Sequence, residues 1–490
     1  MRRTLVLLAA LVVLVPACSS SSADGEGTCS PGAYPPAPSG ATNVVHVSSA
    51  CTGGDGSATA PYGSLTAGLA AAPEGAVLLV APGTYKENVV IRKPVTIVGT
   101  TDASKAELAG IILQAPAPYA LVANGAGAVV VRGVRVAGAT GVGIWATGAT
   151  TLDVEGCAVE DTKASADAAG GFGVYGSDGA TLNLRTSTVT GSTSIGAYLS
   201  GARGIILQNQ VRKNGAGGVR VEDGTAEIRI EGNDVSGNVD TGISVFSSRA
   251  IILQNQARDT TLGKNAGDGI LIGKTLGSSV AADVQIEKNE VTGNARVGIL
   301  VDTGSGGIIL QNNASQNGVN TAKEFGAGIW LQGATVDFTV EGNTMDGNRF
   351  LGLGLTGGAH GIILQNVVRD TAPASFRDPS TLQTITSADG IAVLRGAVAS
   401  IGKKGGSAAP NSITGSNMRV GILLDSAGMG TVVGANTVSP GSSGAIILQN
   451  QPAGAVTADQ GVETKTLAAD QALPIRSSDL TAGSSVAAAK

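Results

Sequence analysis

Gly204-Ile-Ile-Leu-Gln-Asn209 is the stretch of sequence that decides the fold of this chain. Its core, Ile-Ile-Leu-Gln, occurs six times, and Asn follows in five of the six copies. A Gly or Ala precedes every copy. The copies begin at Ile111, Ile205, Ile251, Ile308, Ile362 and Ile446. Because a tetrapeptide does not recur six times in 490 residues by chance, the chain is predicted to be a stack of like units.

A second recurring pattern, Gly-[Ile/Val/Leu]-x-[Val/Leu/Ile], has the period-two alternation of a short β-strand. Its copies begin at Gly218, Gly242, Gly269, Gly298, Gly328, Gly352, Gly390 and Gly421, with looser versions at Gly143, Gly173 and Gly196. Most intervals are 22 to 31 residues, and a second strand ending in an Asn turn lies between copies, as in Ile228-Arg-Ile-Glu-Gly-Asn233. Two or three short strands per repeat predict a parallel β-helix. Asn tolerates left-handed turn geometry, and stacked Asn side chains are expected to hydrogen-bond between layers.

The composition agrees with thin stacked β-structure. Gly accounts for 73 of 490 residues and aromatic residues for only 3%, which does not suit a core of large side chains. The net charge is −5 and the chain has no basic tract, so nucleic acid is not predicted as a partner.

The N-terminus predicts export. Met1–Ala17 has two arginines and then an apolar run from Leu5 to Val15, which is too short to span a bilayer and is typical of a secretory signal. Val15-Pro-Ala-Cys18 resembles a bacterial lipobox, which implies lipid attachment to Cys18 and a membrane as partner through that lipid. Ser19 after it resembles an outer-membrane signal, so the expected location is the outer membrane or cell surface. Residues 18–42, rich in Ser, Gly and Pro, are predicted to be a flexible tether.

Two stretches of the chain resemble the pectin-lyase-like right-handed parallel β-helix family. They are the Asn/Gly layer repeat from about Val129 to Gln451 and an opening segment that contains Val80-Ala-Pro-Gly-Thr-Tyr85 and Val95-Thr-Ile-Val-Gly99. The resemblance implies an all-β, right-handed parallel β-helix, with a short N-terminal capping helix at Ser64–Ala72. We expect roughly twelve coils at about 4.8 Å each. The expected division is a cap with the first coils at 43–110, the β-helix at 111–451 and a C-terminal tail or cap at 452–490.

Aligning the Asn turns predicts which side chains point outward. In the hexapeptide layer Ile206 points into the core, whereas Ile205 and Leu207 point outward; in the layers between, the outward pair is polar, as in Arg229 and Glu231. The apolar outward pairs, which we call the ribs, form a candidate binding face. They are Ile205/Leu207, Ile251/Leu253, Ile308/Leu310 and Ile362/Leu364.

Insertions are confined to the hexapeptide layers. Nine residues separate the turn Asn from the next strand Gly after each polar layer, but 14, 16 and 24 residues follow Asn255, Asn312 and Asn366. These loops carry apolar residues such as Leu262 and Phe376. Three interpretations remain open: the loops fold back over the ribs, ribs and loops form a groove for an extended ligand, or the ribs only pack in a recently duplicated repeat.

Few residues suit metal or nucleophilic chemistry. The chain has two histidines and no His-x3-His or Cys-x2-Cys spacing, so neither a zinc site nor a Ser-His-Asp triad is predicted. Gly273-Lys-Thr lacks the rest of a phosphate-binding loop, so no nucleotide is expected. In an exported protein Cys29 and Cys51 are the natural disulfide pair, which leaves Cys157 buried and inert.

Carbohydrate chemistry is the remaining possibility. Hydrolases with this fold need paired carboxylates, and lyases need an Asp cluster for calcium with an Arg or Lys as base. Two sets could supply such groups, and the second lies in the longest insertion: Asp302, Asp337, Asp346 and Arg349; and Arg369, Asp370, Arg377 and Asp378.

The sequence thus predicts an exported, lipid-anchored binding or structural surface protein, with polysaccharide or another envelope component as ligand and no cofactor. The alternative is a carbohydrate-active lyase, hydrolase or epimerase with a groove beside the corner loops. Calcium enters only under the lyase alternative, and whether the chain is an enzyme stays open.

Overall fold

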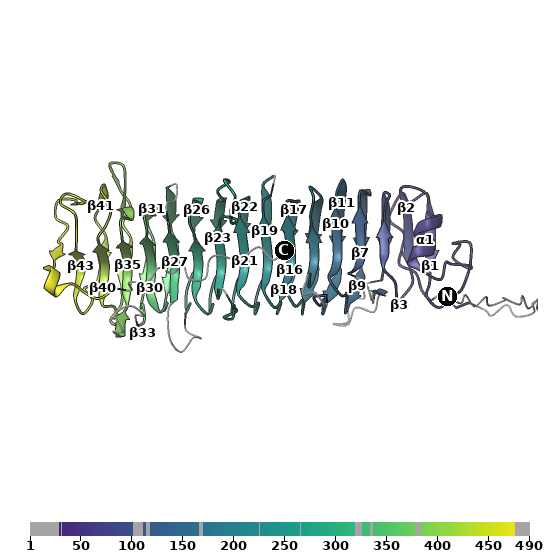
Figure 1. Ribbon diagram of the computed structural model, residues 1–490, viewed down its shortest axis with the longest axis horizontal. Helices are drawn as coiled ribbons and strands as arrows, with labels where there is room; N and C mark the ends of the chain where they lie inside the picture. The colour runs from purple at the N-terminus through teal and green to yellow at the C-terminus, as the bar shows by residue number, and fades with distance from the viewer. Residues whose placement is uncertain are drawn as a thin grey trace, which may run out of the picture.

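The chain forms a single rod of stacked coils (Figure 1). The structure is a computed structural model, and it describes residues 29–30, 32–100, 111–113, 118–165, 170–224, 226–264, 266–318, 326–333, 337–377 and 384–475. Each coil contributes one strand to each of two long parallel sheets and a shorter strand to a third. This arrangement is the parallel β-helix that the repeats predict.

The three sheets are named A, B and C. Sheet A contains 16 strands: β1 (Val44–Val47), β2 (Ala76–Val80), β5 (Val95–Val98), β8 (Gly127–Arg132), β11 (Thr150–Glu155), β14 (Thr181–Arg185), β17 (Arg203–Leu207), β20 (Ile228–Glu231), β22 (Arg249–Leu253), β24 (Asp283–Glu287), β26 (Gly306–Leu310), β28 (Phe338–Glu341), β31 (His360–Leu364), β36 (Val398–Ile401), β41 (Thr431–Val433) and β44 (Val456–Ala458). Sheet C contains 15 strands: β4 (Val89–Ile91), β7 (Tyr119–Asn124), β10 (Val142–Thr147), β13 (Phe172–Gly176), β16 (Ile195–Ser200), β19 (Gly217–Glu222), β21 (Thr241–Phe246), β23 (Asp268–Gly273), β25 (Val297–Val301), β27 (Gly326–Gln332), β30 (Phe350–Thr356), β35 (Asp389–Leu394), β40 (Val420–Asp425), β43 (Gly444–Gln449) and β45 (Lys465–Thr466).

Sheet B is narrower and has two parts joined by single-residue bridges from Gln210 to Thr344. Its strands are β3 (Gly83–Tyr85), β6 (Ile111–Leu113), β9 (Val134–Ala137), β12 (Ala158–Glu160), β15 (Thr188–Thr190) and β18 (Gln210–Arg212), then β29 (Thr344–Asp346), β32 (Val367–Arg369), β39 (Ser412–Thr414) and β42 (Thr437–Val438). Two antiparallel hairpins leave the coils, β33 (Ala374–Arg377) with β34 (Thr384–Ser387), and β37 (Lys403–Lys404) with β38 (Ser407–Ala408).

The stack is longer than the twelve coils expected from the sequence, because sheets A and C have 16 and 15 strands. At about 4.8 Å per layer the rod is about 75 Å long. The expectation fell short because the first coils lack the Asn turn and the glycine entry that mark the later ones.

Helix α1 (Leu65–Ala71) packs against the first strands at the N-terminal end of the rod (Figure 1). Ser64 is its N-cap, since the Ser64 hydroxyl accepts from the Ala67 N–H at 3.1 Å. The Glu87 carboxylate accepts from the Leu65 and Thr66 N–H groups at 2.7 and 2.9 Å, which places a negative charge at the helix N-terminus. Leu65 belongs to the core that runs through all coils, so α1 covers the apolar end of that core.

Residues 32–42, part of the expected tether, have no helix or strand but contact the first coil. Pro35 is buried, and the Tyr34 ring lies edge-on to His46 with centroids 4.7 Å apart. Cys29 forms a disulfide with Cys51, with their Cα atoms 5.3 Å apart. This part of the segment is therefore held against the fold.

An asparagine ladder fixes the corner between sheets A and B. The backbone N–H and Nδ2 of Asn233 donate to Asn255 Oδ1 at 3.0 and 2.9 Å, and its Nδ2 also donates to the Ile206 carbonyl at 2.8 Å. The same bonds recur through Asn209, Asn233, Asn255, Asn289, Asn312, Asn343, Asn366, Asn411 and Asn436. The expectation that these Asn residues take the left-handed turn is wrong. The preceding residue takes it, as at Gln208 with φ 55° and Gly232 with φ 64°, which frees the Asn side chain to point inward and stack.

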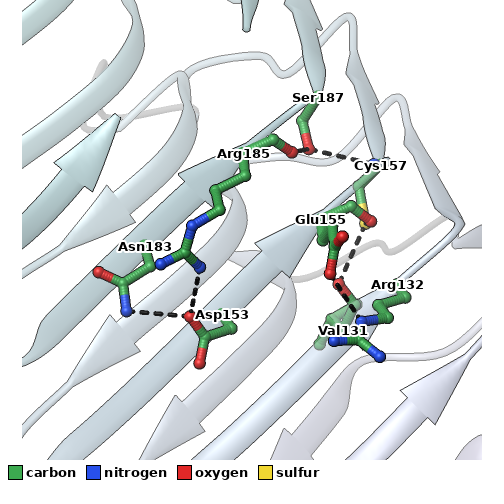
Figure 2. Close-up of polar contacts among 8 residues, drawn as sticks. All are labelled: Val131, Arg132, Asp153, Glu155, Cys157, Asn183, Arg185 and Ser187. Atoms are coloured by element: carbon green, nitrogen blue, oxygen red, sulfur yellow. Dashed lines mark hydrogen bonds and ion pairs between the residues drawn. The ribbon is translucent and has the colours of Figure 1, made fainter. Parts of the chain in front are cut away.

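Cys157 and Ser187 occupy the two ladder positions before Asn209 (Figure 2). The Ser187 N–H donates to Asn209 Oδ1 at 2.9 Å, and the Cys157 N–H donates to Ser187 Oγ at 3.1 Å. The Cys157 thiol in turn lies 3.5 Å from the Val131 carbonyl oxygen. A small polar side chain therefore replaces Asn where the ladder begins.

The recurring glycine lies where sheet C begins and cannot carry a side chain. A Cβ at Gly218 would lie 2.7 Å from both Asn238 Nδ2 and the Gly242 carbonyl oxygen of the next layer. The glycine pattern thus marks a close approach between coils rather than a flexible point.

The six hexapeptide copies do not share one position. Four lie in sheet A, but the first forms β6 in sheet B and the last forms β43 in sheet C. In β43 the faces are reversed: Ile446 joins the main core and Ile447 joins a cluster on the outer face of sheet C. A shift of one residue in the alternation turns every side chain to the other face of its sheet. The same tetrapeptide can therefore present either of its two Ile residues to the core.

Candidate functional site

Three aromatic side chains stack along the outer face of sheet C. Trp145 of β10 pairs in register with Tyr175 of β13, which pairs with Tyr198 of β16. The Trp145 and Tyr175 ring centroids are 5.8 Å apart at 29°, and those of Tyr175 and Tyr198 are 5.1 Å apart at 27°. They face outward because Ile144 and Ala146, on either side of Trp145, belong to the main core.

Two further rings join this stack. Tyr119 meets Trp145 edge to face with centroids 6.5 Å apart, and Phe172 lies 5.2 Å from Tyr175 and 5.1 Å from Tyr198. The chain has only 2 Trp, 6 Tyr and 6 Phe, so five of its 14 aromatic residues gather at one place. We call these five residues the aromatic strip.

The aromatic strip borders a cleft of about 560 Å³. Four of its rings, those of Trp145, Phe172, Tyr175 and Tyr198, line the cleft. A wall comes from the segments that connect sheet B to sheet C, and Glu222 of β19 adds a carboxylate. The wall residues are Ala164, Ser165, Gly170, Thr193 and Ser194. The Ala164 N–H donates to Thr193 Oγ1 at 2.8 Å, which ties neighbouring coils of the wall together.

Glu222 is held on both carboxylate oxygens. Tyr198 OH and, at 3.3 Å, Ser200 Oγ donate to Oε1, and Arg220 donates through Nε and Nη2 to Oε2 at 3.0 and 2.7 Å. Glu222 is only 7% exposed. The Arg220 guanidinium lies 5.7 Å from the Tyr198 ring centroid and 5.1 Å from that of Phe246, within cation–π range of both rings.

The phenols at the cleft stay protonated at neutral pH. Burial raises the pKa of Tyr198 well above its ordinary value, and the hydrogen bond to Glu222 raises it further. Burial also raises the pKa of Tyr175, and the charges of Asp178 and Glu222 add to that effect. Both hydroxyls therefore remain hydrogen-bond donors.

A polar row runs beside the stacked rings and orients them. Trp145 Nε1 donates to Ser177 Oγ at 3.0 Å. Ser177 Oγ and Thr147 Oγ1 donate to Asp178 Oδ2 at 2.9 and 2.7 Å. The indole is thus fixed by a hydrogen bond as well as by stacking, and the site combines apolar ring surface with convergent polar groups, as ligand clefts do.

A family model described as the right handed beta helix region matches residues 96–257 and 256–438. The two matches together span well over half of the chain. The chain belongs to the right-handed β-helix family.

Solved structures resemble this right-handed β-helix in fold alone. The Dettilon tailspike protein gp208 is 18% identical with a TM-score of 0.44, and the similarity covers 60% of each chain. The A-module of the mannuronan C-5 epimerase AlgE6 of Azotobacter vinelandii is 16% identical with a TM-score of 0.41, covering 62% of this chain and 88% of that one. The catalytic unit of the GH87 alpha-1,3-glucanase of Streptomyces thermodiastaticus is 14% identical with a TM-score of 0.43, covering 91% of this chain and 72% of that one. No curated protein matches the sequence.

The ribs of this β-helix lie on the outer face of sheet A, in the predicted register. Leu207 pairs with Arg185 in the layer before it and with Glu231 in the layer after it, so apolar and polar layers alternate. Ile205 and Leu207 are half-buried, as are Ile251/Leu253 and Ile308/Leu310 of the next two ribs.

The described parts of the corner loops lie between sheets B and C, whereas the ribs lie on the outer face of sheet A. The loops connect sheet B to sheet C, and Ala374 of the longest loop packs into the outer-face cluster of sheet C. Leu262, in the first long loop, is 55% exposed. The layer without an insertion, Ile205/Leu207, is half-buried in the same way as the Ile251/Leu253 and Ile308/Leu310 layers, which have one. Leu364 is buried, and it lies where hairpin β37–β38 contacts β31.

The candidate loop site is not assembled among the described residues. Arg369 projects from β32 and forms an ion pair with Asp346 of the preceding layer at 3.3 Å. Asp370 follows it in an exposed left-handed turn with φ 48°. The Arg377 side chain and Asp378 lie outside the described residues.

The other predicted carboxylate set is dispersed. Asp302 follows a strand of sheet C and accepts from Gln332 Nε2 at 2.9 Å, whereas Asp337 precedes a strand of sheet A and lies 3.4 Å from His360 Nδ1. Asp346 belongs to sheet B. Within the described ranges, no group of three or more His, Cys, Asp or Glu side chains could hold a metal ion.

Cys157 is buried and unpaired, and burial raises its pKa to about 11. Cys18, the candidate lipid attachment site, lies outside the described residues. In the part of the chain that the structure describes, no helix is long and apolar enough to cross a membrane.

The sequence carried a signal for the aromatic strip that we did not interpret. The third position of the glycine pattern is the outward one, and the looser copies place Trp145, Tyr175 and Tyr198 there. Three successive aromatic residues at an outward position indicate a stacked column once the register is known.

Proposed function

We propose that this β-helix is a polysaccharide-binding protein that holds a segment of glycan chain in the cleft bordered by the aromatic strip. The gathering of five aromatic residues, four of which line one cleft, in a chain that is 3% aromatic is the observation that carries the proposal. Sugar rings have apolar C–H faces and polar hydroxyl edges. The aromatic rings can pack against the C–H faces of sugar rings. The phenol, serine and carboxylate groups of this cleft can hydrogen-bond to sugar hydroxyls.

The cellular setting that we propose is the outer membrane or cell surface. A lipid on Cys18 would anchor the chain, and the segment from Cys18 to the disulfide at Cys29 would leave the rod free to reach a glycan. The resemblance of Val15-Pro-Ala-Cys18 to a lipobox supports this part of the proposal. Metabolic labelling with a radioactive fatty acid, with and without Cys18→Ser, tests it, and a label that persists in the variant would contradict it.

Binding is tested with the purified full-length chain and a panel of polysaccharides, measured by affinity electrophoresis and calorimetry. We expect retention by at least one glycan and an affinity at least about tenfold weaker for Trp145→Ala, since a buried aromatic anchor is typically worth more than 1 kcal/mol. Leu262→Ala removes a similarly apolar but 55% exposed side chain outside the cleft and is the matched control.

The ribs remain the competing binding face. Leu207→Glu places a charge on a rib without touching the cleft. A loss of affinity in Leu207→Glu with none in Trp145→Ala would show that sheet A binds the glycan. Retention of no polysaccharide by the unchanged chain would refute the proposed function.

A carbohydrate-active enzyme is the second candidate, and Glu222 favours it. This carboxylate lies at the cleft beside a tyrosine and an arginine, next to segments that connect sheet B to sheet C. Unsaturated products would indicate a lyase and new reducing ends a hydrolase. Binding without either product supports a binding role.

A further inference from the structure

The charges around the cleft define the class of glycan that it can take. Of the described residues that line it, Glu222 is the only ionisable acid or base apart from the two tyrosines. Lys163 is exposed and adjoins the wall residue Ala164, but it is not among the lining residues. A ligand carboxylate would therefore meet no cation among these described lining residues.

Arg220, the nearest buried cation, already interacts with other groups of the protein. Two of its nitrogens bond to Glu222, and its guanidinium lies between the Tyr198 and Phe246 rings. Its side chain is only 13% exposed. Because both nitrogens donate to the same oxygen of a buried carboxylate, turning Arg220 toward a ligand would break a charge-assisted contact and leave Glu222 Oε2 without its arginine.

Asp178 adds a second negative charge near the rings. Its carboxylate accepts from Thr147 and Ser177, and no arginine or lysine forms an ion pair with it among the described residues. Because Arg220 offsets the charge of Glu222, Asp178 is the charge near the rings with no ion-pair partner among the described residues, and it makes the local field negative. A negative field repels an anionic ligand and still accepts hydrogen bonds from hydroxyl groups.

We infer that the cleft takes an uncharged polysaccharide and discriminates against polyuronates. The inference rests on the proposed function, and it names the substrate class for the same site. Asp178 acts in it as the specificity determinant, because its charge disfavours a carboxylate on the incoming sugar, and Glu222, already paired with Arg220, offers such a carboxylate no cation.

Matched pairs of glycans test the inference. Each neutral polymer is paired with its C6-oxidised counterpart of the same linkage: β-1,4-, β-1,3-, α-1,4- and α-1,3-glucans with the corresponding glucuronans, and galactan and mannan with polygalacturonate and mannuronan. We expect the unchanged full-length chain to bind at least one neutral polymer, and its oxidised partner at least about tenfold more weakly at low salt. Raising the ionic strength should reduce the difference in affinity between the neutral polymer and its oxidised partner, since salt screens partly exposed charges.

A variant that gains a positive charge at the cleft separates the effect of charge on glycan binding from the effect of cleft shape. Ser194→Lys adds one cation to the wall, and Ser194→Gln replaces the same wall residue with a long side chain that has no charge. Relative to Ser194→Gln, Ser194→Lys should raise the ratio of the affinity for the oxidised polymer to that for its neutral partner several-fold, whatever either change does to binding of the neutral polymer. This pair avoids Glu222, whose removal would leave Arg220 buried and unpaired.

The outcomes distinguish the inference from the proposed function. Binding of a polyuronate as tightly as, or more tightly than, its neutral partner would overturn the inference and leave polysaccharide binding intact. Equal behaviour of Ser194→Lys and Ser194→Gln would also overturn the inference alone. Failure to bind any polymer of either class would overturn both.

Discussion

At the scale of single residues, Cys157 shows how the ladder tolerates a substitution. Ser187 occupies the equivalent position one layer later, and its hydroxyl donates to the Arg185 carbonyl at 2.8 Å as the Cys157 thiol does to Glu155 at 3.4 Å. Cys157→Ser should therefore change the free energy of unfolding by less than about 1 kcal/mol at pH 7. Chemical denaturation followed by circular dichroism measures this change.

The same substitution should change how stability depends on pH. The thiol pKa is raised from 9.0 to about 11 in the folded chain, so below pH 9 the thiol is neutral in both states and contributes no pH dependence. Between pH 9 and 11 the unfolded thiol loses its proton first, and stability falls as pH rises. The unchanged chain should lose about 2 kcal/mol more than Cys157→Ser across that window. Parallel curves for the two proteins would contradict the assignment.

At the scale of elements, the Asn ladder links the corner between sheets A and B in one coil to the same corner in the next coil. Asn255 Oδ1 accepts two hydrogen bonds from Asn233, and its Nδ2 donates to the Ile230 carbonyl and Asn289 Oδ1 at 2.8 and 3.0 Å. Asn255→Ala should cost at least about 3 kcal/mol, because several buried polar groups lose their partners and each costs about 1–3 kcal/mol. Urea denaturation provides the measurement.

Asn183→Ala is the control for this prediction. Asn183 is half-buried on the outer face of sheet A and donates one side-chain bond, to Asp153 at 2.9 Å (Figure 2). Its removal should cost less than about 1 kcal/mol. Similar losses for the two variants would mean that the ladder has no special role in the corner.

The repeats predicted most of this layer architecture. A side-chain period of two and a fixed Asn corner were enough to place Ile206 inward and Ile205 outward, because register follows from those two facts. The orientation of the last hexapeptide copy was not predicted, since Ile446 and Ile447 exchange faces when the same tetrapeptide lies in sheet C. The path of the loops was not predicted either, because loop length does not reveal the sheet against which a loop packs.

At the scale of the whole molecule, the outer face of sheet C divides into two zones. The aromatic strip lies toward the N-terminal end, and an apolar cluster that includes Leu300, Trp330 and Leu423 continues toward the C-terminal end. The aromatic strip could not be predicted from composition, because its meaning depends on neighbouring coils that bring Trp145 and Tyr175, 30 residues apart in sequence, into one stack.

The C-terminal segment folds back along that second zone. Leu467, Leu473 and Ile475 pack against the cluster, and Leu473 exchanges two backbone hydrogen bonds with the Gln449 side chain at 2.8 and 2.9 Å. Arg419 also donates to the Pro474 carbonyl at 2.7 Å. The last strands of sheets A and C, β44 and β45, are short and mostly exposed, so these side contacts stabilise an end at which the described residues form no α-helix.

Leu473→Asp should therefore loosen one end of the rod and leave the other unchanged. In a stack where each coil contacts only its neighbours, a charge on the apolar cluster weakens nearby coils without reaching distant ones. Hydrogen–deuterium exchange with mass spectrometry should show faster exchange in β40, β43 and β45, whereas α1 and β1, about 70 Å away, keep their protection. Leu276→Asp changes a leucine that is 80% exposed and should alter exchange at neither end. Uniform loss of protection along the rod would instead mean that the coils unfold as one cooperative unit.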